Sequence, residues 1–218
     1  MASALNAAPL VALDTPVGRI VLELHEDKPV TVANFLAYID SGRYQNSFAH
    51  RLDPGFVLQG GGFTLQELTP TYVPTYPPIV NEYNVGQVRS NVLGTIAMAK
   101  LGGDPNSATS QWFLNLADNS ANLDKQNGGF TVFGSVVDGM EVLQLFNTTF
   151  NQGATGGRGV YDASGIHPSF TSLPLLSSGL TTADLVYTGW TVVPEPRVSA
   201  LLAAGATVLL FARRRRPV

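Results

Sequence analysis

The chain has 218 residues, of which 44% are hydrophobic and 13% charged, so it is long enough for one domain with a sizeable core. The net charge of -3 gives no general attraction for nucleic acid, and the only dense basic cluster is Arg213 to Arg216. Without cysteine the chain has no thiol nucleophile, disulfide or thiolate metal site, and His25, His50 and His167 are too scattered to predict a metal site.

The first part of the chain predicts a hairpin followed by a helix. Residues 1–9 are small and polar and lack the apolar stretch of a signal peptide. Apolar, partly alternating segments at 11–13 and 19–24 flank a Thr-Pro-Val-Gly turn, which is typical of a β-hairpin. Apolar residues at helical spacing then predict a helix that begins at Pro29 and is closed by Gly42.

Short apolar segments recur along the middle of the chain and predict strands rather than helices. They lie at 48–52, 55–59, 95–99, 110–116 and 131–136. Many short strands with few helices indicate a closed or nearly closed β-barrel.

Two intervals interrupt this pattern and predict surface segments. Residues 64–78 contain four prolines, which cannot donate backbone hydrogen bonds. After a second predicted helix at 138–146, residues 147–178 are rich in Gly, Ser and Thr and predict surface loops. A last strand is expected at 184–193, where the domain should end.

Three sequence blocks carry a family resemblance. The first, residues 48–63, reads FAHRLDPGFVLQGGGF, and the second, residues 94–115, contains GTIAMA and SATSQWFLN. The third, residues 123–134, begins with LD and ends with FTVFG. In this order they resemble the cyclophilin family of peptidyl-prolyl cis-trans isomerases, and the resemblance covers about residues 11–193.

The resemblance implies a mainly β fold, a closed eight-stranded antiparallel β-barrel capped by two α-helices, with a proline-binding groove on its outer face. It also implies an enzyme that accelerates rotation about Xaa-Pro peptide bonds in proline-containing polypeptides. Such an enzyme needs no cofactor and no metal. We expect it to be a monomer that does not bind nucleic acid.

The resemblance also assigns candidate site residues position by position. Arg51 falls on the catalytic arginine of the family, and Gln59 is predicted to act with it by holding the substrate backbone. The positions predicted to bind substrate are Phe56, Val57, Ala99, Lys100, Gln111, Phe113, Leu123 and Phe130. Asn122 stands where many eukaryotic members have tryptophan, which weakens any expectation of tight cyclosporin binding.

These residue types suit the rotation of an amide bond. Rotation meets a barrier of about 18 to 20 kcal/mol because the nitrogen lone pair is delocalised into the carbonyl group. No covalent bond breaks, so the enzyme needs only a surface that binds the twisted amide better than either planar isomer. The guanidinium of Arg51 can donate to the developing lone pair or to the adjacent carbonyl oxygen, while apolar side chains hold the pyrrolidine ring.

Other interpretations of the same residues remain open at this stage. Taken alone, Arg51 would be a surface salt-bridge residue, Phe56 and Phe113 would be core aromatics, and His50 is interpreted as structural. An alternative function is a non-catalytic module that binds proline-containing peptides at the cell surface. The arginine favours the enzyme, because a pure binder has less need of it.

The C-terminal segment resembles a sorting signal. Val193-Pro194-Glu195-Pro196 precedes an apolar run at 198–212 and then the four arginines, an order that resembles the PEP-CTERM signal of exported bacterial proteins. We expect a C-terminal apolar helix that contacts the membrane through 198–212, although about 22 Å of helix is short for a hydrocarbon core of about 30 Å. The resemblance implies processing by an exosortase-type protease.

These observations predict the organisation and location of the chain. The expected parts are an N-terminal extension at 1–9, an isomerase domain at 10–193 and a membrane-sorting segment at 194–218. Arginines that follow the apolar run would stay on the cytoplasmic side, which places the domain in the periplasm or on the surface of a Gram-negative bacterium. Because exported proteins of this kind carry a signal peptide, we expect the natural start to lie further upstream.

Overall fold

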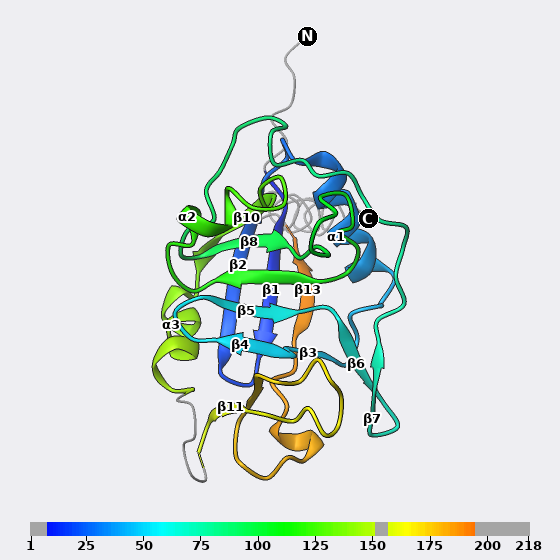
Figure 1. The fold of residues 1–218 in the computed structure, drawn as a ribbon, viewed down its shortest axis with the longest axis vertical. Coiled ribbons are helices and arrows are strands. Elements are labelled where there is room, and N and C mark those ends of the chain that lie inside the picture. Colours follow the sequence, from blue (N-terminus) through cyan, green and yellow to red (C-terminus); the bar gives the residue numbers. More distant parts are fainter. Residues whose placement is uncertain (1–7, 151–156, 195–218) are drawn as a thin grey trace, which may run out of the picture.

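An antiparallel sheet of eight strands is the centre of the fold (Figure 1). The computed structural model describes residues 8–150 and 157–194. In spatial order the strands are β13 (Gly189–Val193), β1 (Leu10–Thr15), β2 (Gly18–Leu24), β10 (Val132–Asp138), β8 (Thr95–Met98), β9 (Trp112–Asn115), β5 (Val57–Gly60) and β4 (Arg51–Asp53). Most expected strands are present within a few residues. The one expected at 48–52 is divided between Ser47–Phe48 and Arg51–Asp53, which belong to different sheets. The last strand begins at Gly189, because the residues before it form a 3-10 turn at Thr182–Asp184 and two isolated bridges at Leu185 and Tyr187.

The sheet is curled but open, which corrects the expectation of a closed barrel. Within the described residues, β4 and β13 do not pair as strands. The residues just before each of them are joined by a bridge between Phe48 and Tyr187 and by hydrogen bonds from the Ala49 N–H to the Val186 carbonyl at 2.9 Å and from the Thr188 N–H to the Ser47 carbonyl at 2.8 Å. The free edge of β4 is covered instead by a later segment, because the Leu52 N–H donates to the Ser172 carbonyl at 2.8 Å. Pairing with that segment takes the place of pairing between the two outer strands.

Two helices pack against the sheet, as expected, and two shorter helical turns accompany them. These are α1 (Pro29–Asp40), α3 (Met140–Thr148), the four-residue α2 (Ser120–Leu123) and the 3-10 turn named above. Gly42 follows α1 with a φ of +70°, the left-handed conformation that suits a glycine just after a helix. Phe35 of α1 contacts Phe133 and Trp190, so aromatic rings join the helix to the sheet inside the main core.

The start of α1 is held by a residue far along the chain. The buried Glu82 carboxylate accepts hydrogen bonds from the N–H groups of Val30 and Thr31 at 3.1 and 2.7 Å. In return the buried Lys28 ammonium donates to the Glu82 carbonyl at 2.9 Å. This exchange fastens the long irregular segment before β8 to the first turn of the helix.

The proline-rich segment is more ordered than the sequence predicted. Its first half forms a hairpin of β6 (Phe63–Gln66) and β7 (Thr69–Tyr72), which joins β3 (Ser47–Phe48) in a separate three-stranded sheet. Pro70 is tolerated because β7 is the edge strand, where its missing N–H breaks no pairing.

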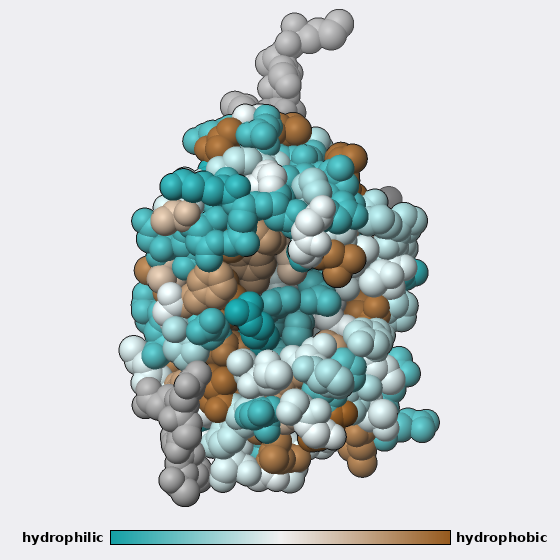
Figure 2. Space-filling model, in the orientation of Figure 1, coloured by the Kyte–Doolittle hydropathy of each residue, from teal (hydrophilic) through white to brown (hydrophobic). Residues whose placement is uncertain are grey.

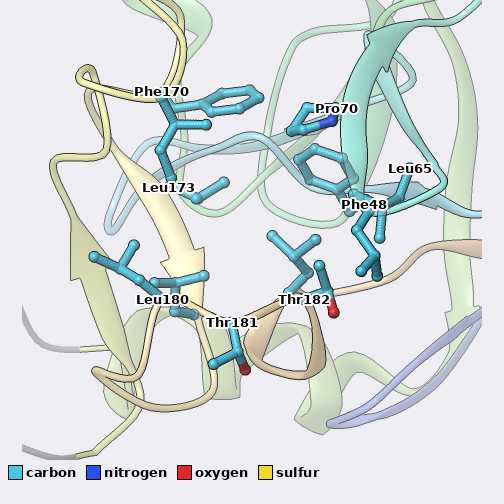
Figure 3. A pocket seen from close by; sticks show the side chains of 12 residues that line it. Phe48, Leu65, Pro70, Phe170, Leu173, Leu180, Thr181 and Thr182 are labelled. Atoms are coloured by element: carbon cyan, nitrogen blue, oxygen red, sulfur yellow. The ribbon is translucent and has the colours of Figure 1, made fainter.

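The glycine- and serine-rich segment also differs from the expectation of surface loops alone. It contributes a small hairpin of β11 (Gly159–Tyr161) and β12 (Leu173–Leu175), and Phe170 and Leu173 are buried in a second apolar cluster with Phe48 and Phe63. Figure 3 shows an apolar hollow between this cluster and the β6–β7 hairpin, with Phe170, Leu173 and Pro70 facing it.

None of the helices in the described part of the chain has the length and apolar character needed to cross a membrane. The C-terminal helix expected at 198–212 lies outside the described residues.

Candidate active site

The residues predicted from the sequence to form the site lie together on one face of the curled sheet. Nine of the ten line a single hollow: Arg51, Phe56, Val57, Gln59, Ala99, Lys100, Phe113, Leu123 and Phe130. The tenth, Gln111, lines the adjoining hollow, and its side chain accepts a hydrogen bond from Gln59. Figure 2 shows a depression near the middle of the viewed face where apolar and hydrophilic side chains meet.

The alternation of strand side chains places these residues on the outer face. The registers pair Arg51 of β4 with Gln59 of β5, and Gln59 with Phe113 of β9, so the three side chains form a row across three strands. Side chains of adjacent residues point to opposite faces of a sheet. The fully buried neighbours on the core side are Leu52, Leu58 and Leu114.

The polar side of the hollow is a short chain of hydrogen bonds. Arg51 Nη1 donates to Gln59 Oε1 at 3.4 Å, and Gln59 Nε2 donates to Gln111 Oε1 at 2.8 Å. Arg51 Nη2 lies 3.5 Å from Asp53 Oδ2, with the arginine side chain 38% exposed. Contacts this long and this exposed stabilise the fold little, so the guanidinium is oriented but keeps donors for a substrate.

The apolar side of the hollow is a packed wall of aromatic and aliphatic groups. Val57, Phe113 and Leu123 are between 2% and 6% exposed. The ring of Phe113 meets that of Phe130 in a T-shaped contact, with centroids 5.7 Å apart. The partly buried Phe56 packs against the same cluster. A preformed apolar surface of this kind can bury a five-membered ring without rearranging.

A network of buried amides positions this wall, and sequence reasoning missed it. Asn119 Nδ2 donates to the Phe56 carbonyl at 2.8 Å, and Asn91 Nδ2 donates to the Phe130 carbonyl at 3.0 Å. Asn115 connects the two, donating to Asn91 and accepting from Asn119. Single asparagines carry no signal in a sequence, so only their convergence in space reveals this role.

His50 lies beside the site but is not equipped for proton transfer at neutral pH. Its side chain is 4% exposed, and burial lowers its pKa to about 4. The imidazole is therefore neutral at pH 7, and its ring packs against Phe63.

The adjoining hollow adds residues that sequence reasoning did not assign. Leu101, Ser107 and Thr109 line it with Gln59, Ala99, Lys100 and Gln111. Ser107 and Thr109 lie inside the second sequence block, but polar residues in a loop give no sign of facing a pocket.

Across residues 8–150 and 157–194, no group of three or more His, Asp or Glu side chains could hold a metal ion.

On the outer face of the curled antiparallel sheet, the structure thus places an apolar pocket that could bury a small ring beside an arginine with free hydrogen-bond donors. The family model described as cyclophilin type peptidyl-prolyl cis-trans isomerase/CLD matches residues 10–160. The chain therefore belongs to the cyclophilin-type peptidyl-prolyl cis-trans isomerases.

Individual relatives agree with this family. Peptidyl-prolyl cis-trans isomerase A of Dickeya dadantii (strain 3937) is 46% identical over 135 residues, which are 61% of this chain and 67% of the relative. Peptidyl-prolyl cis-trans isomerase B of Escherichia coli (strain K12) is 37% identical over 180 residues, 80% of this chain and 100% of the relative. The crystal structure of a Cryptosporidium parvum cyclophilin type peptidyl-prolyl cis-trans isomerase superposes with a TM-score of 0.56 and 22% identity. The match covers 87% of this chain and 99% of the Cryptosporidium chain, and at this identity it shows the shared fold alone.

Proposed function

We propose that this peptidyl-prolyl cis-trans isomerase assists the folding of exported bacterial proteins, with Arg51 and Gln59 as its catalytic residues. The observation that carries the assignment of residues is the placement of the Arg51 guanidinium at the edge of the apolar hollow. A proline ring seated in that hollow brings its own amide bond next to the arginine.

In the proposed mechanism the apolar wall holds the proline while the preceding carbonyl turns. Phe113 and Leu123 hold the pyrrolidine ring in place. Because the proline side of the bond is then fixed, only the preceding carbonyl has to turn, and less of the barrier is entropic. As the amide twists, its nitrogen becomes pyramidal, and Arg51 donates to the localised lone pair or to the neighbouring carbonyl oxygen. This interaction is stronger for the twisted amide than for either planar isomer, so it lowers the barrier.

The glutamines have supporting roles in this proposal. Gln59 accepts from Arg51 and donates to Gln111, so it orients the guanidinium. The remaining amide donors and acceptors can pair with the substrate backbone on either side of the proline. No proton changes place, which agrees with a neutral, buried His50.

A protease-coupled isomerisation assay on an Ala-Pro peptide tests the proposed residues. We expect Arg51→Ala to lower kcat/KM by about 100-fold, the scale for losing one charged donor to a transition state. Arg51→Lys should recover only part of this, because lysine supplies charge without the planar fork. An Arg51→Ala variant that is folded by circular dichroism and as fast as the wild type would disprove the role of Arg51.

The proposed location is supported by the order of motif, apolar run and arginines in residues 193–216. In a Gram-negative host that contains an exosortase-type protease, the full natural gene product should fractionate with the periplasm, membrane or cell surface. Replacing Pro194-Glu195-Pro196 with three alanines should increase the fraction that stays membrane-bound and unprocessed. A protein found only in the cytoplasm, with its tail intact, would refute export.

A further inference from the structure

Lys100 is a half-buried cation without a carboxylate partner. Its ammonium donates to the carbonyls of Asn127 and Gly129 at 2.8 and 2.7 Å and lies 4.6 Å from the centre of the Phe130 ring. No carboxylate of the described residues lies within 4 Å of it, whereas Arg51 has Asp53 at 3.5 Å. Burial alone lowers the Lys100 pKa to about 8, with no acidic neighbour to raise it again.

This cation lies where two hollows meet. Lys100 lines both the apolar hollow, with Phe113 and Phe130, and the adjoining hollow, with Ser107 and Thr109. The adjoining hollow has amide, hydroxyl and aliphatic walls, and Lys100 is its only charged lining residue among those described. Among the described residues, Lys100 is therefore the one charged residue that borders both hollows.

We propose that Lys100 selects Xaa-Pro segments that carry a carboxylate side chain within three residues of the proline, because that carboxylate accepts a hydrogen bond from the Lys100 ammonium. The inference rests on the proposed function, because the proline must occupy the apolar hollow for its neighbour to reach Lys100. The two hollows share Gln59, Ala99 and Lys100, so the distance to cover is short.

The electrostatic reason is the state of the cation before substrate binds. Its present acceptors are neutral carbonyls and a ring face, and an ammonium has three donors to share. A carboxylate would add a charge-assisted hydrogen bond at a site that is already partly shielded from water. An ammonium side chain on the substrate would instead be repelled by Lys100 and, across the apolar hollow, by Arg51.

The other charged groups on the surrounding segments do not neutralise this site. Asp104, on the loop after Lys100, accepts from the Asn106 N–H at 3.0 Å. Asp124, on the segment before Asn127, accepts from the N–H and Nδ2 of Asn91 at 2.9 and 2.8 Å. Lys125 is exposed and lines neither hollow. Neither aspartate lines a hollow, so Lys100 is the charged group nearest to a side chain placed at their boundary.

The test compares peptides that differ in one side chain. The full chain is assayed with proline peptides bearing Glu, Gln or Lys at each of the three positions before and after the proline. At pH 7 and low salt, kcat/KM should be about two- to fivefold higher for Glu than for Gln at one or more positions, the range of a partly exposed ion pair. Lys at the same position should be poorer than Gln, and the preference should weaken in high salt.

Variants assign the preference to its residue. Because Lys100 belongs to the binding surface, the measured quantity is the Glu-to-Gln ratio within each variant and not its absolute rate. Lys100→Met keeps the aliphatic stem and should bring the ratio close to one, and Lys100→Glu should invert it. Lys125→Met, a matched lysine substitution outside both hollows, should keep the wild-type ratio.

The outcomes separate the inference from the proposed function. If the wild type turns over the Gln peptide but shows no Glu preference at any position, the inference is wrong and the isomerase assignment stands. A Glu preference that survives Lys100→Met belongs to another cation, such as Arg51, and also overturns it. If the folded wild type turns over none of the peptides, the proposed function and the inference fall together.

Discussion

Phe113→Ala is the substitution that tests the apolar wall most sharply. The ring of Phe113 is 4% exposed and meets Phe130 at 5.7 Å, so it forms one face of the proposed proline pocket. A pyrrolidine ring carries three CH₂ groups, and burying each contributes about 0.8 kcal/mol. If Phe113 covers about half of that surface, its loss removes about 1.2 kcal/mol of binding, which is about an eightfold decrease in kcat/KM.

The assay must separate this effect from a general loss of stability. Truncating a buried phenylalanine costs about 3 kcal/mol or more, so urea unfolding should accompany the kinetics to show that Phe113→Ala is folded under assay conditions. Val137→Ala, an apolar truncation on an exposed position of β10, is the matched control and should leave kcat/KM unchanged. A folded Phe113→Ala with wild-type kcat/KM would refute the proposed proline pocket.

Three further predictions concern groups around the site. The folded-state pKa of His50 is about 4, below its usual 6.5, so the unfolded chain takes up a proton at His50 before the folded chain does. The free energy of unfolding should therefore fall as the pH drops from 6.5 towards 4. Urea unfolding of His50→Gln should show a smaller fall over that range, and a fall equal to that of the wild type would contradict the role of His50. Asn119→Ala removes the donor to the Phe56 carbonyl and should lower stability by about 1 to 2 kcal/mol and also reduce kcat/KM; unchanged unfolding and kinetics would show that the amide network does not position the wall. The Lys100 pKa is lowered to about 8, so the Glu-to-Gln preference should decline as the pH rises from 7 to 9, and a preference that increases over this range would contradict a cationic origin.

The site residues were predicted from the family resemblance, which assigns them position by position. The register of β4, β5 and β9 explains why Arg51, Gln59 and Phe113 share one face, but strand alternation alone does not tell which face meets solvent. The adjoining hollow could not be predicted in the same way. Ser107 and Thr109 come from a loop, where the direction of a side chain depends on contacts with distant segments.

The open sheet and the second apolar cluster could not be predicted from local patterns. Coverage of the β4 edge depends on a hydrogen bond between Leu52 and Ser172, which are far apart in sequence. The β6–β7 hairpin turns at Glu67 and Leu68, with φ values of +45° and +69°. This left-handed pair is normally occupied by Asn-Gly, so the usual signal of a two-residue hairpin is missing.

Equilibrium exchange measured by NMR tests the central claim most directly, because it observes rotation without a coupled protease. A proline peptide with resolved cis and trans signals is mixed with a catalytic amount of the full chain, and the exchange rate is compared with that for folded Arg51→Ala. Uncatalysed exchange takes about 10 to 100 s. The account predicts a much shorter exchange time with the wild type, and an exchange time close to the uncatalysed one with Arg51→Ala. Binding shifts without faster exchange in the wild type would contradict the isomerase assignment and indicate a proline-binding module.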